Sequence, residues 1–193
     1  GMDASQGDDF WAFTWIIPLG RGRYGVQTRS YVSEVKYRRL NSATQAKYDQ
    51  LQAEGTLVIM PGNYLDWEFV YEDISAYIEE MEWAVISFGY DPYNAKEFVE
   101  RWCMENGDTG VEVVRQGSKT ESVPLGELKN MATSRDLIFF EELMKYAMGN
   151  AVVVQDNNGN YKLSKMRSDE KIDNVAALMD AWVAYKRNKE AFL

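Results

Sequence analysis

The chain has 193 residues, of which 46% are hydrophobic and 13% aromatic, so it is long and apolar enough to fold around a core. Its net charge of −9 argues against a general nucleic-acid binder, and no apolar run approaches the roughly eighteen residues that a membrane-spanning helix needs. Histidine is absent and the one cysteine is Cys103, which excludes histidine-based general bases, structural zinc sites and an internal disulfide. Any enzymatic chemistry therefore rests on carboxylates, lysines, tyrosines or metals with oxygen ligands, which favours magnesium, manganese or calcium.

The chain begins with an acidic segment and a predicted antiparallel hairpin. Residues 10–19 form a buried-strand pattern, and residues 26–36 alternate as a returning strand. Between them lies a glycine-punctuated turn that carries Arg21 and Arg23. This basic tip is either a solvated turn or a contact for a phosphate backbone. The glycines open no helix, so they do not form a nucleotide-binding loop.

The middle of the chain alternates between strand and helix patterns. We expect strands over 56–60, 83–88 and 111–114, and helices over 42–53, 67–81 and 94–106. This order predicts an α/β sheet with parallel crossovers. A helical pattern with breaks follows over 122–148, then a hairpin over 151–163 and a last helix from about residue 172.

Three aspartates stand out by their positions. Asp3 lies on the first strand, and Asp91 follows the run 83–88, at the edge where open α/β sheets place their sites. Asp173 lies in the first turn of the last helix, where an anion is favourable. If they converge, their mutual repulsion requires cations, and two divalent ions would also hydrolyse a phosphodiester.

Each aspartate also has an ordinary structural interpretation. Asp173 is equally explained as a helix-dipole residue, Asp91 before Pro92 as a turn or capping residue, and Asp3 as a residue of a frayed terminus. Asp66 is a fourth candidate metal ligand, but it is better explained as a helix N-cap. Asp9 is a turn residue that could still lie near a metal. Spacing alone does not establish a nuclease.

The sequence resembles the C-terminal nuclease domain of the large terminase subunit of tailed bacteriophages. The most specific match is the segment 89–95, Gly-Tyr-Asp-Pro-Tyr-Asn-Ala. The opening Gly-Met-Asp-Ala-Ser, followed by Asp9 and an apolar run, matches the family's first strand. Residues 171–177, Lys-Ile-Asp-Asn-Val-Ala-Ala, match its last helix, with Asn174 where proline or glycine is usual.

This resemblance implies an α/β, RNase H-like fold, with a central mixed sheet, an antiparallel hairpin at its start and helices on both faces. It implies one nuclease domain over 1–193, without the family's N-terminal ATPase domain. It also implies cleavage of concatemeric double-stranded DNA during packaging, with Asp3, Asp91 and Asp173 as the catalytic ligands of two Mg²⁺ or Mn²⁺ ions. The expected partners are the ATPase domain, the small terminase subunit and the portal protein, in the host cytoplasm, with no membrane.

Two further expectations concern contacts with DNA and alternative functions. Arg21, Arg23, Lys165 and Arg167 are candidates for contacts to the DNA backbone. The alternatives to a packaging nuclease are another RNase H-like nuclease, of the resolvase or recombinase type, and a non-catalytic docking module of a packaging motor.

Overall fold

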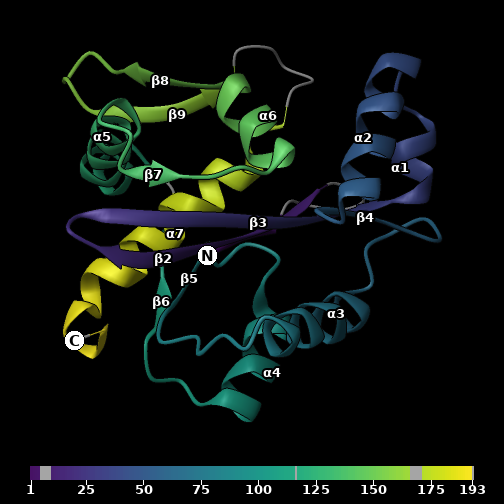
Figure 1. Cartoon of the computed structure of the whole chain (residues 1–193), viewed down its shortest axis with the longest axis horizontal. Helices are drawn as coiled ribbons and strands as arrows, with labels where there is room; N and C mark the ends of the chain where they lie inside the picture. The colour runs from purple at the N-terminus through teal and green to yellow at the C-terminus, as the bar shows by residue number, and fades with distance from the viewer. Residues whose placement is uncertain (5–9, 116, 166–170, 193) are drawn as a thin grey trace.

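A mixed sheet of seven strands forms the centre of the computed structural model, which describes residues 1–4, 10–115, 117–165 and 171–192 (Figure 1). The strand order is β4-β3-β2-β1-β5-β6, and β7 pairs with the other end of β3. The pairs β1–β2 and β2–β3 are antiparallel, and the remaining pairs of this sheet are parallel. The strands are β1 (Met2–Ala4), β2 (Trp11–Gly20), β3 (Arg23–Ser33), β4 (Leu57–Met60), β5 (Phe88–Tyr90), β6 (Val111–Val113) and β7 (Leu137–Ile138).

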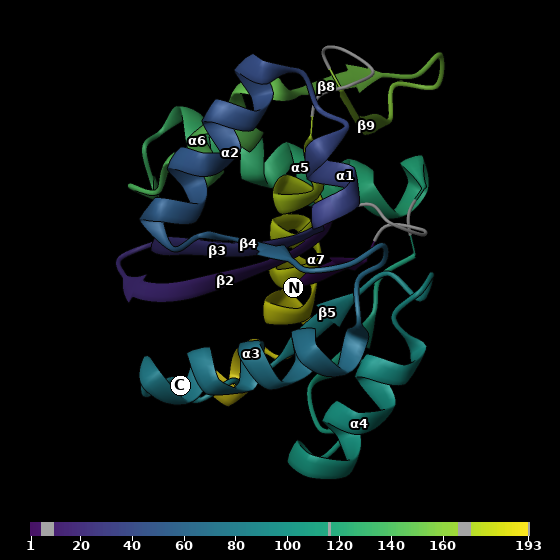
Figure 2. The same ribbon diagram turned by 90° about the vertical axis from the view of Figure 1, so that its right-hand side faces the viewer.

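Helices lie on both faces of the sheet, as Figure 2 shows from the side. The helices α3 and α4 cover one face, while α2, α5 and α6 lie on the other with the small hairpin β8–β9. The last helix, α7, packs on β2, β1 and β5. The bounds are α1 (Glu34–Arg38), α2 (Ser42–Glu54), α3 (Trp67–Glu80), α4 (Lys96–Asn106), α5 (Ser118–Thr133), α6 (Glu142–Asn150), β8 (Ala151–Gln155), β9 (Tyr161–Lys165), α7 (Asp173–Arg187) and the short 3₁₀-helix Lys189–Phe192.

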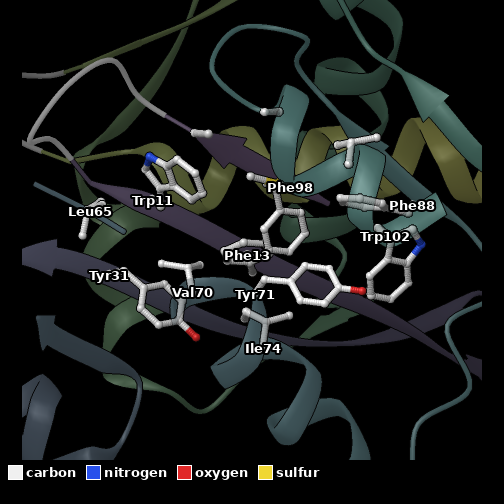
Figure 3. Close-up of a cluster of buried hydrophobic side chains, with 14 of the residues drawn as sticks. Trp11, Phe13, Tyr31, Leu65, Val70, Tyr71, Ile74, Phe88, Phe98 and Trp102 are labelled. Atoms are coloured by element: carbon white, nitrogen blue, oxygen red, sulfur yellow. The ribbon is translucent and has the colours of Figure 1, made fainter. Parts of the chain in front are cut away.

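The face under α3 and α4, which we call the aromatic face, is filled by large side chains (Figure 3). Phe13 of β2 lies edge-on to Tyr31 of β3, with ring centroids 5.9 Å apart, and 5.2 Å from Phe98 of α4. Trp102 of α4 closes the cluster against Phe88 of β5. Burial of this much aromatic surface is the main stabilising contribution on this side.

The opposite face, which we call the α7 face, carries two further clusters of buried apolar side chains, and small residues bring α7 close to the sheet between them. A methyl group added to Gly89 would lie 2.0 Å from the backbone oxygen of Asp180, and one added to Gly1 would lie 1.9 Å from that of Ala177. Both distances are too short for any side-chain carbon. Glycine at these two positions therefore lets the backbone of α7 approach the backbones of β1 and β5 directly.

Most predicted elements are confirmed, with two exceptions. The returning strand was predicted over 26–36, but it ends at Ser33, whose side chain caps α1 from Glu34. The other exception lies in the centre of the sheet. The apolar run 83–88 was expected to be a strand, but β5 begins only at Phe88. β6 pairs with β5 from Phe88 onward, and β1 pairs with it at Tyr90, so the strand begins where its first partner begins. Among the described residues, no helix is long and apolar enough to cross a membrane.

Candidate active site

Asp3 and Asp91 lie side by side at the carboxyl ends of β1 and β5. The two strands are parallel, with Met2 opposite Tyr90, so the next residue on each strand is an aspartate. Adjacent strands lie about 5 Å apart. Met2 and Tyr90 belong to the aromatic face, so alternation along each strand directs Asp3 and Asp91 to the α7 face. The structure thus brings together two of the three predicted ligands.

Asp91 is held in place by its own turn. The backbone N–H of Tyr93 donates to Asp91 Oδ1 at 2.9 Å. The carboxylate is buried, with 4% of the residue exposed to solvent. A turn of this kind is what the ordinary interpretation of Asp91 predicted, and it is compatible with a site because it fixes the carboxylate where the parallel strand ends.

Asp173 is the first residue of α7, and its neighbour Asn174 anchors the helix start to the sheet. The Asn174 amide donates to Thr28 Oγ1 at 2.6 Å and to Ser30 Oγ at 2.8 Å, and the Thr14 hydroxyl donates to the Asn174 carbonyl at 3.0 Å. All four of these residues are buried. The polar network therefore fixes the first turn of α7, and with it Asp173, on the α7 face.

The sheet register places this anchor relative to the other two aspartates. Ser30 lies opposite Ala12, and Ala12 lies opposite Asp3. Asn174 therefore lies over β2 and β3, since it bonds to Thr14 of β2 as well as to Thr28 and Ser30 of β3, and β2 is the strand next to β1. The start of α7, and with it Asp173, thus lies on the same face of the sheet as Asp3 and Asp91.

A further carboxylate, Asp180, lies under α7 and was missed by the sequence reasoning. It is completely buried, and neither of its oxygens has a hydrogen-bond partner among the described residues. Burial, and after it the negative charge of Asp3, raises the pKa of Asp180 well above its ordinary value, while the Gly1 amino group lowers it. The available signal was an aspartate on the apolar side of a helix, between Ala177 and Ala184.

These residues match divalent cations in chemistry but do not form a finished cage. Carboxylate oxygens are the ligands that magnesium and manganese prefer. The surroundings of Asp180 disfavour its ionised form, and a cation bound nearby would stabilise that form. In the described part of the chain, no group of three or more acidic, histidine or cysteine side chains is arranged to hold a metal ion. Asp3, Asp91 and Asp173 thus share a face without converging on one point.

The family comparison adds an independent line of evidence to this geometry. A model of the terminase large subunit endonuclease domain matches residues 1–189. The chain belongs to this family. Curated terminase large subunits from Lactococcus phage p2 and Enterobacteria phage HK97 are 24% and 25% identical over 92% of the chain. The chain spans 33% and 35% of their lengths, so it corresponds to about a third of each relative.

Solved structures of terminases share the fold of this terminase nuclease domain. The HK97 large terminase superposes with a TM-score of 0.82 at 23% identity, over 95% of this chain and 38% of that one. The large terminase nuclease from thermophilic phage G20c superposes with a TM-score of 0.55 at 12% identity, over 97% of this chain and 80% of that one. The fold is RNase H-like, as the resemblance implied.

An open hollow of about 390 Å³ borders Asp91 in this terminase nuclease domain. It is lined by Asp91, Pro92, Tyr93 and Arg115. Asp91 is the first residue after β5 and Arg115 is the second residue after β6, so the same sheet edge presents a cation beside a carboxylate. Arg115 is exposed. The sequence reasoning missed it, although its position after a short parallel strand was a usable signal.

The predicted DNA-binding residues lie elsewhere. Arg21 lies in the exposed turn at the tip of β2–β3, and Arg23 is the exposed first residue of β3. Gly20 is eight residues beyond Ala12, the residue opposite Asp3, or about 26 Å along an extended strand. The structure thus separates these arginines from the aspartates. The side chain of Lys165, and Arg167 and Asp9 as a whole, lie outside the described residues.

The fourth candidate, Asp66, has a purely structural role in the described residues. Its side chain accepts the backbone N–H of Glu68 at 3.0 Å and so caps α3. This confirms the capping interpretation.

Proposed function

We propose that this chain is a metal-dependent DNA endonuclease domain that cuts concatemeric phage DNA during genome packaging. The observation that carries the proposal is the parallel pairing of β1 with β5, which puts Asp3 beside Asp91 in a chain of the terminase nuclease family. We take residues 1–193 as one domain. It would work on double-stranded DNA in the host cytoplasm, with the ATPase domain, the small terminase subunit and the portal protein as partners.

Asp3, Asp91 and Asp173 would hold two Mg²⁺ or Mn²⁺ ions. When bound, such ions lower the pKa of water for attack on phosphorus and stabilise the leaving oxygen. The chain's own groups orient the ligands, since the Tyr93 N–H fixes Asp91 and the Asn174 network fixes the helix start at Asp173. Burial, and after it the charge of Asp3, raises the pKa of Asp180 and so favours its neutral form, while a cation bound nearby would favour ionisation.

Arg115 would bind the DNA strand that is cut. Its guanidinium borders the same hollow as Asp91, and a planar cation is well suited to a phosphate. The acidic balance of the chain predicts weak DNA binding by this domain alone. The basic hairpin tip at Arg21 and Arg23, together with Lys165 and Arg167, would add backbone contacts remote from the cut.

A plasmid-nicking assay with Mn²⁺ or Mg²⁺ tests the proposal. We expect Asp91→Ala to reduce the cleavage rate by at least about a hundredfold, the scale seen when a group that stabilises the transition state is removed. Asp108→Ala is the matched control, because Asp108 is an exposed aspartate in a turn. Arg115→Ala should weaken cleavage mainly by raising the KM for DNA.

The outcomes separate the candidate functions. Equal cleavage by the wild type and Asp91→Ala would show that the assigned site is wrong. Cation binding without cleavage of any DNA would favour a non-catalytic docking module, which the incomplete carboxylate cage also allows. Preferential cleavage of four-way junctions over linear duplexes would favour a resolvase-type nuclease.

A further inference from the structure

Tyr93 is an exposed aromatic residue beside a candidate metal ligand. It lies two residues after Asp91, and 77% of it is exposed to solvent. Among the described residues, its ring has no aromatic neighbour and its hydroxyl has no hydrogen-bond partner. The side chain therefore adds little to the packing of the domain, and most of its surface is available to a ligand.

The turn that carries Tyr93 is held at both of its ends. The Tyr93 N–H donates to Asp91 Oδ1 at 2.9 Å, and the ring of Pro92 between them fixes its own φ. Asn94 adopts the left-handed conformation, at a φ of 58°, and Ala95 is then buried in the cluster of the aromatic face. An aromatic ring on such a fixed turn loses little backbone freedom when it binds, which favours affinity.

The hollow of about 390 Å³ beside Asp91 combines this aromatic ring with a cation. Its lining consists of Asp91, Pro92, Tyr93 and Arg115. An aromatic ring and a guanidinium are the groups with which proteins bind single-stranded nucleic acid, because the ring stacks on a base and the cation binds a phosphate. The volume lies within the range of small-molecule sites, so the hollow is large enough for one nucleotide.

We propose that Tyr93 and Arg115 form a subsite for one unstacked nucleotide of the strand that is cut. The Tyr93 ring stacks on the base, and Arg115 binds a phosphate of the same strand. The inference rests on the proposed function, which places the scissile phosphate at Asp91. It goes further by requiring that one base near the cut leaves the duplex stack.

This requirement predicts a preference among DNA substrates. A base reaches the Tyr93 ring only if the duplex opens locally, and opening costs least where the base is already unpaired. The domain should therefore bind a duplex with an unpaired segment more tightly than a perfect duplex of the same length.

The two side chains should also differ in their response to salt. The Tyr93 ring is uncharged, so its contribution to binding should be the same at low and high salt concentration. The contribution of Arg115 should weaken as the salt concentration rises, because a contact to phosphate releases counterions.

Quenching of a fluorescent base tests the inference. The probe is a DNA duplex with a short bubble that contains 2-aminopurine, whose fluorescence falls when an aromatic ring stacks on it. It is titrated without metal with the Asp91→Asn chain, because asparagine still accepts the Tyr93 N–H but no longer repels phosphate. We expect quenching, and Tyr93→Ala in this background should abolish it and weaken binding by at least about fivefold. Tyr93→Phe should keep both.

Tyr64→Ala is the matched control. Tyr64 is 67% exposed and follows β4 at the same edge of the sheet. The strand order places β4 four strands from β5, or roughly 19 Å away, so Tyr64 is remote from the hollow. This substitution should leave quenching and affinity unchanged. Arg115→Ala should reduce the dependence of the binding constant on salt, whereas Tyr93→Ala should not.

Equal quenching and affinity before and after Tyr93→Ala would overturn the inference, as would the absence of quenching by the Asp91→Asn chain. Binding of the bubble no tighter than that of the perfect duplex would also contradict it. All of these readouts use uncleaved DNA without metal. Unchanged nicking after Asp91→Ala would count against the proposed function without altering them, so the two failures are distinguishable.

Discussion

The two faces of the central sheet both bury apolar clusters, but they differ in how closely a helix backbone approaches the strands. The aromatic face buries large rings such as Phe13, Tyr31 and Phe98, whose contacts are many and individually weak. The α7 face brings backbone against backbone at Gly1 and Gly89 and buries polar groups in a specific network. Both faces supply apolar burial, but the close backbone contacts and the buried polar network are features of the α7 face, which also carries the candidate aspartates.

The largest expected effect is at the closest approach on the α7 face. Gly89→Ala puts a methyl group 2.0 Å from the Asp180 backbone oxygen, which forces α7 away from β5. We expect a loss of more than about 3 kcal/mol, which corresponds to a fall in Tm of roughly 6–12 °C or failure to fold. Thermal unfolding measures it.

Two control variants show whether the loss of stability is specific to the close contact between α7 and β5. Gly149→Ala has open space around the new methyl group in α6 and should raise stability by about 0.5–1 kcal/mol. Phe98→Leu removes several carbons from the aromatic face and should cost about 1.5 kcal/mol. If Phe98→Leu proves more damaging than Gly89→Ala, the contrast between the faces is wrong.

A smaller effect is expected at the anchor of α7. Asn174→Ala removes the amide that donates to Thr28 and Ser30, leaving buried hydroxyls with fewer partners. This should cost about 2 kcal/mol, or roughly 4–8 °C in Tm. Asn106→Ala is the control on the aromatic side, because its bonds to Tyr71 and Trp102 are long, at 3.4 and 3.3 Å. Similar losses at both asparagines would remove the distinction.

The smallest expected effect is at the edge of the sheet, in the gap between the part of β3 that pairs with β7 and the part that pairs with β4. Glu141 fills this gap by accepting the Thr28 N–H at 2.7 Å. Burial raises the pKa of Glu141 to about 7, with the backbone bond opposing and the Glu54 charge adding to the shift. A raised pKa means that the folded state holds the proton more tightly, so stability from this group falls as the pH rises from about 4.5 to 7.

Glu141→Gln keeps an acceptor for Thr28 and removes the ionisation. At pH 8 it should raise Tm by roughly 2–4 °C, the shift produced by about 1 kcal/mol after allowance for partial exposure to water. At pH 4.5 the variant and the wild type should melt together. Melting curves at both pH values check this, and a difference that is independent of pH would contradict the assignment.

Local patterns were sufficient to predict much of the fold. The hairpin, the helix caps and the position of Asp91 after a parallel strand depend on residues close together in the sequence. The short length of β5 was not predictable in this way, because it depends on partners from β1 and β6. Strand pairing is non-local, and an apolar run such as 83–87 does not reveal whether a neighbour is present.

The site was predicted only in part for the same reason. Asp3 and Asp91 are adjacent because two distant segments pair in one register. Asp180 and Arg115 carry no local motif, and their relation to Asp91 appears only when α7 and β6 are in place. The serine and threonines under Asn174 look like ordinary strand residues until the helix start lies above them.

If the hairpin tip and the aspartates act on DNA as proposed, the distance between them sets how a duplex could lie on the domain. The tip lies about 26 Å along β2 from Ala12, and an arginine side chain adds several ångströms. That total approaches one helical turn of B-DNA, about 34–36 Å, after which the duplex presents the same side again. A duplex lying along the hairpin would thus offer the tip and the aspartates equivalent grooves one turn apart. The stiff β2–β3 ribbon would then act as a spacer between the point of grip and the point of cleavage.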